Sequence, residues 1–110
     1  MINETILYGY WRSSATYRAR IALNLKGIAY KTVGVHLLKY ENISPEHLAR
    51  HPSGRVPILE IDGQRIGQSM AMVEYLDETR PEPPLLPRDA YLRAHVRDLK
   101  DRRVFVLVDR

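Results

Sequence analysis

The sequence predicts one α/β domain with a mixed four-stranded sheet and helices on both of its faces. Three patterns lead to this fold class. An apolar segment, a helical segment and a second alternating segment predict a right-handed β-α-β unit near the N-terminus. Two short strand patterns joined by Asp62-Gly63 predict an antiparallel hairpin. A further helical pattern follows the hairpin and ends at a run of prolines, which a helix does not cross.

The β-α-β unit begins close to the N-terminus. Ile6–Trp11 is apolar and rich in aromatic residues, which predicts a buried strand. Ser14–Lys26 is expected to form a helix that Gly27 ends. The apolar residues of this helix recur at helical spacing: Tyr17, Ile21, Ala22 and Leu25.

A second strand and a short helix come next. Polar and apolar residues alternate over Tyr30–Leu37, which predicts a strand with its apolar side chains on one face. Ser44 is a typical N-cap, and Pro45 suits the first helical position. We expect this short helix to end before Pro52.

The hairpin and its helix complete the predicted domain. Pro57–Ile61 and Gln64–Gly67 are the two hairpin strands. Ser69 is expected to cap a helix over 70–79. The prolines that follow form a stiff linker, after which Asp89 is expected to cap another helix.

The predicted order β-α-β-α-β-β-α is that of thioredoxin-like domains. It divides the chain into a thioredoxin-like domain over 1–80, a proline-rich linker over 81–88 and a helical region that starts over 89–110. The end of the chain departs from this plan, because Val104–Val108 is an apolar run that favours a β-strand.

Composition narrows the classes of function. The chain has 110 residues, of which 45% are hydrophobic and 27% are charged, as expected for one soluble globular domain. It contains no apolar run of membrane-spanning length and begins without a signal-peptide pattern, so we expect a cytoplasmic protein. The net charge of +4 comes from scattered basic residues. It indicates either a solvated basic surface or an affinity for small anions, rather than nucleic-acid binding.

Metal and redox chemistry of the chain itself are not expected. The chain contains no cysteine, which excludes disulfides and thiolate metal sites. Its four histidines, at positions 36, 47, 51 and 95, are dispersed along the sequence, and we expect them at the surface. A reactive thiol would therefore have to arrive on a cosubstrate.

The first candidate site lies where the first strand meets the first helix, at Arg12-Ser13-Ser14. Backbone N–H groups at a helix start are unpaired, and the helix dipole makes this end positive. A serine hydroxyl there can donate a hydrogen bond to an anion or a thiolate. The alternative is a serine that only caps the helix.

Two further positions complete the candidate site. Val56-Pro57 enters a strand, where a cis peptide bond would turn the backbone of Val56 outward to pair with an extended peptide. An ordinary proline of an edge strand is the alternative. Gln68-Ser69 stands at the start of the next helix and is suited either to holding a carboxylate or to capping alone.

The chain resembles the N-terminal domain of zeta-class glutathione transferases, which include the maleylacetoacetate and maleylpyruvate isomerases. The segment Arg-Ser-Ser followed by Arg-Ala-Arg-Ile-Ala-Leu is the part most specific to this class. Ala15 departs from the family pattern, which has a cysteine at this place. The resemblance extends from Thr5 to about Lys100 and rests on these segments: Tyr8–Gly27, Arg55–Leu59, Asp62-Gly63, Gln68–Arg80 and, after them, Pro84–Pro87.

This resemblance implies a glutathione-dependent cis-trans isomerase of maleyl compounds, acting in aromatic amino acid catabolism. The glutathione thiolate would add to the conjugated double bond, allow rotation and leave again. Ser13 would activate the thiol, and Arg12 would anchor a substrate carboxylate. The residues that would contact glutathione are Ser13, Ser14, Val56, Gln68 and Ser69, with Asn42 as a candidate for its glycyl end.

Family members carry a second, all-helical domain that forms most of the substrate site, and only its start is expected here. Two alternatives to the enzyme therefore stay open: a glutathione-binding module without turnover, and an inactive fragment. The expected partners are glutathione and a small anionic substrate, without nucleic acid or membrane. The resemblance also allows a homodimer.

Overall fold

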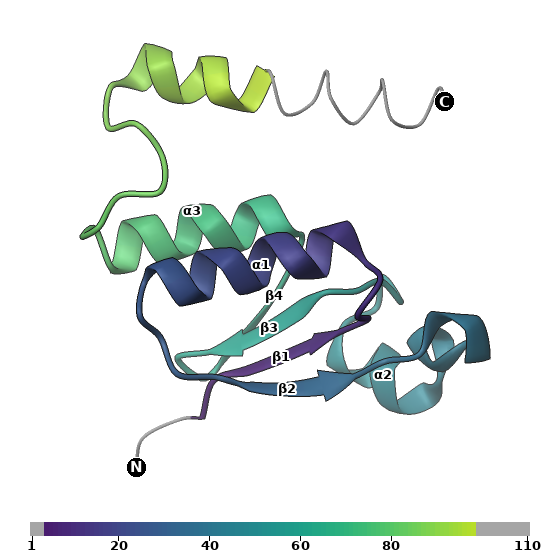
Figure 1. Cartoon of the computed structure of the whole chain (residues 1–110). Helices are drawn as coiled ribbons and strands as arrows, with labels where there is room; N and C mark the ends of the chain where they lie inside the picture. Colours follow the sequence, from purple (N-terminus) through teal and green to yellow (C-terminus); the bar gives the residue numbers. More distant parts are fainter. Residues whose placement is uncertain (1–3, 99–110) are drawn as a thin grey trace.

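A mixed sheet forms the centre of the molecule in the computed structural model, which describes residues 4–98 (Figure 1). The parallel pairing of the first two strands and the antiparallel pairing of the last two confirm the predicted β-α-β unit and hairpin. The third strand runs antiparallel to the first. The four strands, in spatial order β2-β1-β3-β4, are β1 (Ile6–Gly9), β2 (Lys31–Gly34), β3 (Ile58–Ile61) and β4 (Gln64–Gly67).

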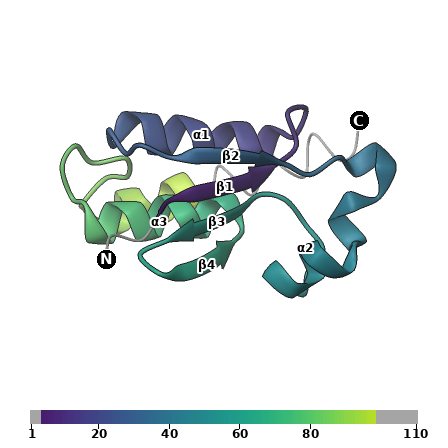
Figure 2. The same ribbon diagram turned by 90° about the horizontal axis from the view of Figure 1, so that it is seen from below.

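Helices cover the sheet as the predicted fold class requires. The helices α1 (Ser14–Leu25) and α3 (Ser69–Thr79) lie side by side on one face. The short helix α2 (Pro45–Arg50) lies toward the other face, beyond the end of β2 (Figure 2). Two 3-10 turns, η1 (Leu37–Lys39) and η2 (Glu41–Ile43), connect β2 to α2. The arrangement is thioredoxin-like, and the predicted fold class is confirmed.

The first two strands are shorter than predicted. β1 ends at Gly9 because the N–H of Tyr10 turns to the hydroxyl of Thr16 on α1, 3.4 Å away. The predicted strand over Tyr30–Leu37 is likewise cut short after Gly34. There the carboxylate of Glu41 accepts a hydrogen bond from the N–H of His36 at 2.8 Å.

The face of α1 that packs on the sheet is not the predicted apolar stripe. The buried residues of α1 are Thr16, Ala19, Ala22 and Leu23, most of which are small and allow a close approach to β1. Three members of the predicted stripe are instead exposed, to 64%, 44% and 58% of their surface: Tyr17, Ile21 and Leu25. Helical spacing alone predicts the helix but not which of its faces is buried, because both faces of α1 carry apolar residues.

The main hydrophobic core lies between the sheet and the helices α1 and α3. A smaller cluster on the opposite face consists of Tyr8, Val35 and Ile58. The main core includes Leu86, from the segment after α3, which brings that segment onto the domain. Its other buried members are Leu7, Ala19, Ala22, Leu23, Leu59, Ile61, Met72, Val73 and Leu76.

A buried ion pair fixes the proline-rich segment that follows α3. The ammonium group of Lys26 lies 2.8 Å from a carboxylate oxygen of Asp77, and both side chains are at most 5% exposed. The carboxylate also accepts hydrogen bonds of 2.8 Å from the backbone N–H groups of Leu85 and Leu86. Burial acts to raise the pKa of Asp77, but these hydrogen bonds outweigh it and hold the pKa below its ordinary value.

The chain then turns back along the helical face. The carboxylate of Asp89 accepts the N–H of Leu92 at 3.0 Å, which confirms the predicted cap, and residues 90–98 are helical. This helix runs antiparallel to α1 and α3, and Val96 packs against the main core (Figure 1). Among the described residues, none of the helices has the length and apolar character needed to span a bilayer. The predicted apolar run Val104–Val108 lies outside the described residues.

Candidate functional site

Ser13 is positioned by the start of α1. Its backbone is extended, with φ −76° and ψ 122°, and its hydroxyl oxygen accepts the N–H of Thr16 at 3.1 Å. Ser13 therefore caps α1. Because a hydroxyl group can accept and donate at once, capping leaves the hydrogen of Ser13 free to be offered to a ligand. Ser14 is the first residue of α1 and is exposed.

The start of α3 differs from the prediction. Gln68 is the N-cap residue, and Ser69 is already helical, so the prediction that Ser69 caps this helix is wrong. Gln68 has a left-handed φ of 74°, an uncommon conformation for a residue other than glycine. The buried hydroxyl of Ser69 accepts a hydrogen bond from Nη1 of Arg18 at 3.1 Å, which ties α3 to α1.

One cavity of about 350 Å³ is lined by two of the three predicted positions and by the first turn of α1. Its lining includes Ala15 in the first turn of α1, Val56 and Pro57 at the entry to β3, and Gln68 and Ser69 at the start of α3. We call it the Val56 cavity. The peptide bond between Val56 and Pro57 is cis, as predicted. Val56-Pro57 and Gln68-Ser69 therefore meet, with the first turn of α1, around one ligand-sized space.

Four polar residues that line the Val56 cavity were given no role by the sequence analysis. Arg18 lies four residues after Ser14, so helical spacing from the serines was a signal that could have found it. His51, Ser53 and Arg55 come from the loop before Val56, where no spacing rule points to them. Within that loop, Nδ1 of His51 lies 2.9 Å from the hydroxyl of Ser53.

The Val56 cavity is suited to an anion. Its lining carries two guanidinium groups, those of Arg18 and Arg55, and the described residues that line it include no carboxylate. The start of α3 adds unpaired backbone N–H groups and the positive end of the helix dipole. An extended ligand that carries a carboxylate would find both charge and hydrogen-bond donors there.

Some predicted residues lie outside this lining. Ser13 and Ser14 directly precede Ala15 but are not themselves among the lining residues. Arg12 is exposed, and its guanidinium carbon lies 4.6 Å from the centre of the Trp11 ring. The side-chain amide of Asn42 donates to the carbonyl of Gly54 at 2.9 Å, so this residue supports the loop before Val56.

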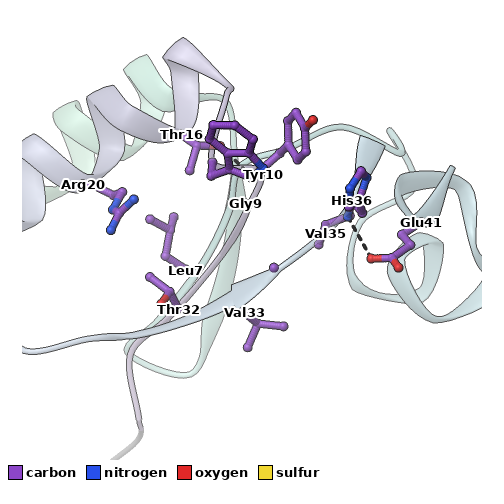
Figure 3. Close-up of a pocket in the computed structure, with 12 residues that line it drawn as sticks. Leu7, Gly9, Tyr10, Thr16, Arg20, Thr32, Val33, Val35, His36 and Glu41 are labelled. Carbon is purple, nitrogen blue, oxygen red and sulfur yellow. Dashed lines mark hydrogen bonds between the residues drawn. The ribbon is translucent and has the colours of Figure 1, made fainter. Parts of the chain in front are cut away.

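A second cavity, of about 370 Å³, lies between α1 and the edge strand β2 (Figure 3). Figure 3 shows Thr16 and Arg20 of α1 on one side and Thr32 of β2 on the other, with His36 and Glu41 at one end. It contains none of the predicted glutathione contacts. It does include Trp11, the residue on which Arg12 stacks, so Arg12 stands beside this second cavity.

The chain is similar to known proteins over most of its length. Residues 3–78 match the N-terminal domain of glutathione S-transferases. The chain belongs to the glutathione S-transferase family. The maleylacetoacetate isomerase of Rhizobium meliloti (strain 1021) is 59% identical to this chain over 99 residues. That match covers 90% of the chain and 46% of the relative, so the chain spans less than half the length of this curated protein.

Solved structures that resemble this chain belong to the same family. A maleylacetoacetate isomerase from Methylobacterium extorquens AM1, with bound malonate and glutathione, is 48% identical with a TM-score of 0.80. A holo maleyl pyruvate isomerase, described as a bacterial glutathione S-transferase of the zeta class, is 46% identical with a TM-score of 0.80. Each alignment covers 86% of the chain and 44% of the solved protein. The resemblance to the zeta class is confirmed.

Proposed function

We propose that the Val56 cavity binds glutathione. The observation that carries this proposal is the meeting of the α1 start, Val56-Pro57 and Gln68-Ser69 around one cavity with a basic lining. Glutathione is a short peptide with two carboxylates and one thiol. Its cysteinyl backbone would pair with Val56, and its γ-glutamyl carboxylate would lie at Gln68-Ser69, close to the charge of Arg18.

The thiol of bound glutathione would lie at the start of α1. A free thiol has a pKa of about 8.5, so it is mostly protonated at neutral pH. The positive end of α1 and a hydrogen bond from Ser13 would both favour the thiolate and lower this pKa. Ser14 would lie beside the sulfur. Ala15 supplies no thiol of its own, so the nucleophile is the cosubstrate's.

We propose cis-trans isomerisation of a maleyl compound as the reaction. The thiolate adds to one carbon of the double bond, and the electron pair of that bond moves into the conjugated carbonyl to give an enolate. The former double bond is now single and can rotate. The enolate then collapses, the carbon–sulfur bond breaks and the trans product leaves with the thiolate restored. Arg12 would hold a substrate carboxylate through its paired N–H donors.

The test separates binding from turnover. Titration of the purified chain with glutathione by calorimetry measures binding, and conversion of maleylacetoacetate or maleylpyruvate in the presence of glutathione measures catalysis. We expect binding that is weakened at least tenfold in Arg18→Met, with Arg88→Met as a control for general loss of positive charge. Arg88 is exposed and is not among the residues that line the Val56 cavity. Failure of the wild-type chain to bind glutathione would contradict the proposal.

Binding without turnover is the second candidate function. It is favoured by the lining of the Val56 cavity, whose described residues account for glutathione but do not include the substrate anchor Arg12. Binding with no detectable isomerisation would support it. We also propose that residues 81–88 separate the glutathione-binding domain from a helical region. A cytoplasmic location and a homodimer are further parts of the proposal. Light scattering of the purified chain tests the homodimer.

A further inference from the structure

We expected His47 to lie at the surface, and this prediction is wrong. It sits in α2 and has no exposed surface. Its Nε2 atom lies 2.8 Å from the backbone carbonyl of Arg55. A carbonyl can only accept, so Nε2 must carry the hydrogen. On the other side of the ring, Nη1 of Arg50 lies 3.4 Å from Nδ1, which then acts as the acceptor.

The carbonyl that His47 binds belongs to the loop that borders the Val56 cavity. Arg55 lines that cavity and directly precedes Val56. The same loop is held at a second point, where Asn42 donates to the carbonyl of Gly54. Gly54 is buried with a left-handed φ of 65°, so its backbone follows a defined path against α2.

The helix that carries His47 is itself anchored on the sheet. The guanidinium carbon of Arg50 lies 4.2 Å from the centre of the Tyr8 ring in β1. Arg50 also pairs with Glu46 at 2.9 Å. A continuous set of contacts therefore runs from β1 through α2 to the peptide group between Arg55 and Val56.

We propose that His47 is a positioning residue for glutathione: its Nε2–H holds the Arg55 carbonyl and so sets the backbone of Val56 for pairing with the peptide ligand. This inference rests on the proposed glutathione binding at the Val56 cavity. An apolar side chain would fill the same buried space without the cost of burying an imidazole. What the imidazole adds is one directed donor, and it is aimed at the residue before Val56.

Two substitutions separate the effect of the His47 hydrogen bond from the effect of packing in the buried space. His47→Leu removes the donor and leaves the Arg55 carbonyl unpaired. His47→Gln keeps an N–H donor near the place of Nε2. We expect glutathione to bind about five- to tenfold more weakly to His47→Leu and within about twofold of wild type to His47→Gln. The amide resonance of Val56 in a ¹⁵N-correlated NMR spectrum should move in His47→Leu and return in His47→Gln.

A matched control shows whether a general loss of stability is enough to weaken glutathione binding. Leu86→Ala destabilises the main core away from the loop before Val56. If Leu86→Ala weakens glutathione binding as much as His47→Leu does, the effect is general and the positioning role is overturned. Wild-type-like binding by His47→Leu also overturns it. If the wild-type chain fails to bind glutathione at all, the proposed function itself is wrong.

A measurement on the wild-type protein keeps the proposal testable even if His47→Leu does not fold. A long-range ¹H–¹⁵N spectrum of the histidine rings reports which nitrogen of His47 carries the hydrogen. The hydrogen bond to Arg55 requires it on Nε2. A hydrogen found on Nδ1 alone would overturn the proposal.

Discussion

Ser13 uses one hydroxyl group for two purposes, one structural and one proposed. Its oxygen accepts the N–H of Thr16 and thereby caps α1. Its hydrogen is the proposed donor to the glutathione thiolate. Substitution by alanine therefore removes a cap and a thiol contact together, and the two effects must be measured separately.

Comparison of Ser13→Ala with Ser13→Gly separates them. Glycine is tolerated at N-cap positions, whereas alanine costs about 1 kcal/mol, so only Ser13→Ala should lower the free energy of unfolding appreciably. Both variants lose the hydroxyl, so both should raise the pKa of the bound glutathione thiol by the same amount. Thiolate absorbance in the ultraviolet as a function of pH measures this pKa. An unchanged thiol titration in Ser13→Gly would remove Ser13 from its proposed role.

Gly9 is required by the close approach of α1 to the end of β1. A Cβ atom built at this position would lie 2.4 Å from Cγ2 of Thr16, whose own side chain is buried. We expect Gly9→Ala to lower the free energy of unfolding by about 1–3 kcal/mol, measured by urea denaturation. Gly34→Ala is the control, because a Cβ atom there meets nothing within 4 Å. Equal losses in the two variants would contradict this explanation.

At the scale of elements, the β3–β4 hairpin is joined to α3 by one carboxylate. Asp62 lies in the predicted two-residue turn, and Asp62 and Gly63 both have positive φ, as expected for this hairpin type. The carboxylate accepts two hydrogen bonds of 3.0 Å from Arg80 and one of 2.7 Å from Tyr75. These bonds, those from Arg80 first, lower the pKa of Asp62 to about 2.

This lowered pKa predicts a pH-dependent contribution to stability. A carboxyl group whose pKa is lower in the folded state stabilises the protein above its ordinary pKa of 3.8 and loses that effect as the pH falls toward 2. Asp62 is 41% exposed, so we expect only about 1 kcal/mol after screening by solvent. The difference in unfolding free energy between wild type and Asp62→Asn should have its maximum value at pH 6 and should decrease between pH 4 and pH 2.

Denaturant unfolding at several pH values checks this prediction, with Arg80→Gln as the matched partner. Because both substitutions break the same contact, their effects in the double variant should be less than additive. A difference between wild type and Asp62→Asn that does not change with pH would show that the carboxylate has no role in joining the hairpin to α3.

At the scale of the whole molecule, α1 presents apolar side chains to two opposite environments. Leu23 is fully buried in the main core, whereas Leu25, two residues later, is 58% exposed. The exposed group on α1 also includes Tyr17 and Ile21. In the described chain these residues contribute little to the core, despite their hydrophobic character.

A pair of leucine substitutions tests whether only one face of α1 contributes to the core. We expect Leu23→Ala to cost about 2–5 kcal/mol of unfolding free energy, because it leaves a cavity in the core. Leu25→Ala should change stability by no more than about 0.5 kcal/mol. Chemical denaturation at two protein concentrations measures both. A large loss in Leu25→Ala that grows with protein concentration would mean that another copy of the chain covers this face.

Local signals in the sequence predicted the elements and their order well. The Asp62-Gly63 turn, the Ser44-Pro45 helix start and the Asp89 cap each depend on backbone chemistry within a few residues, and all three occur as predicted. The strand ends were predicted less well. They depend on side chains such as Thr16 and Glu41, which lie outside the strands and take over their hydrogen bonds.

The sequence by itself determined the order of strands and helices, and it identified Ser13-Ser14, Val56-Pro57 and Gln68-Ser69 as candidate positions. These follow from periodicity, caps and turns, which act over short stretches of chain. Only the tertiary structure decided that α1 buries its small residues, that Arg18 binds Ser69 and that His47 lies inside the protein. Such contacts join residues far apart in sequence, and packing of whole elements chooses among faces that look equally apolar in the sequence.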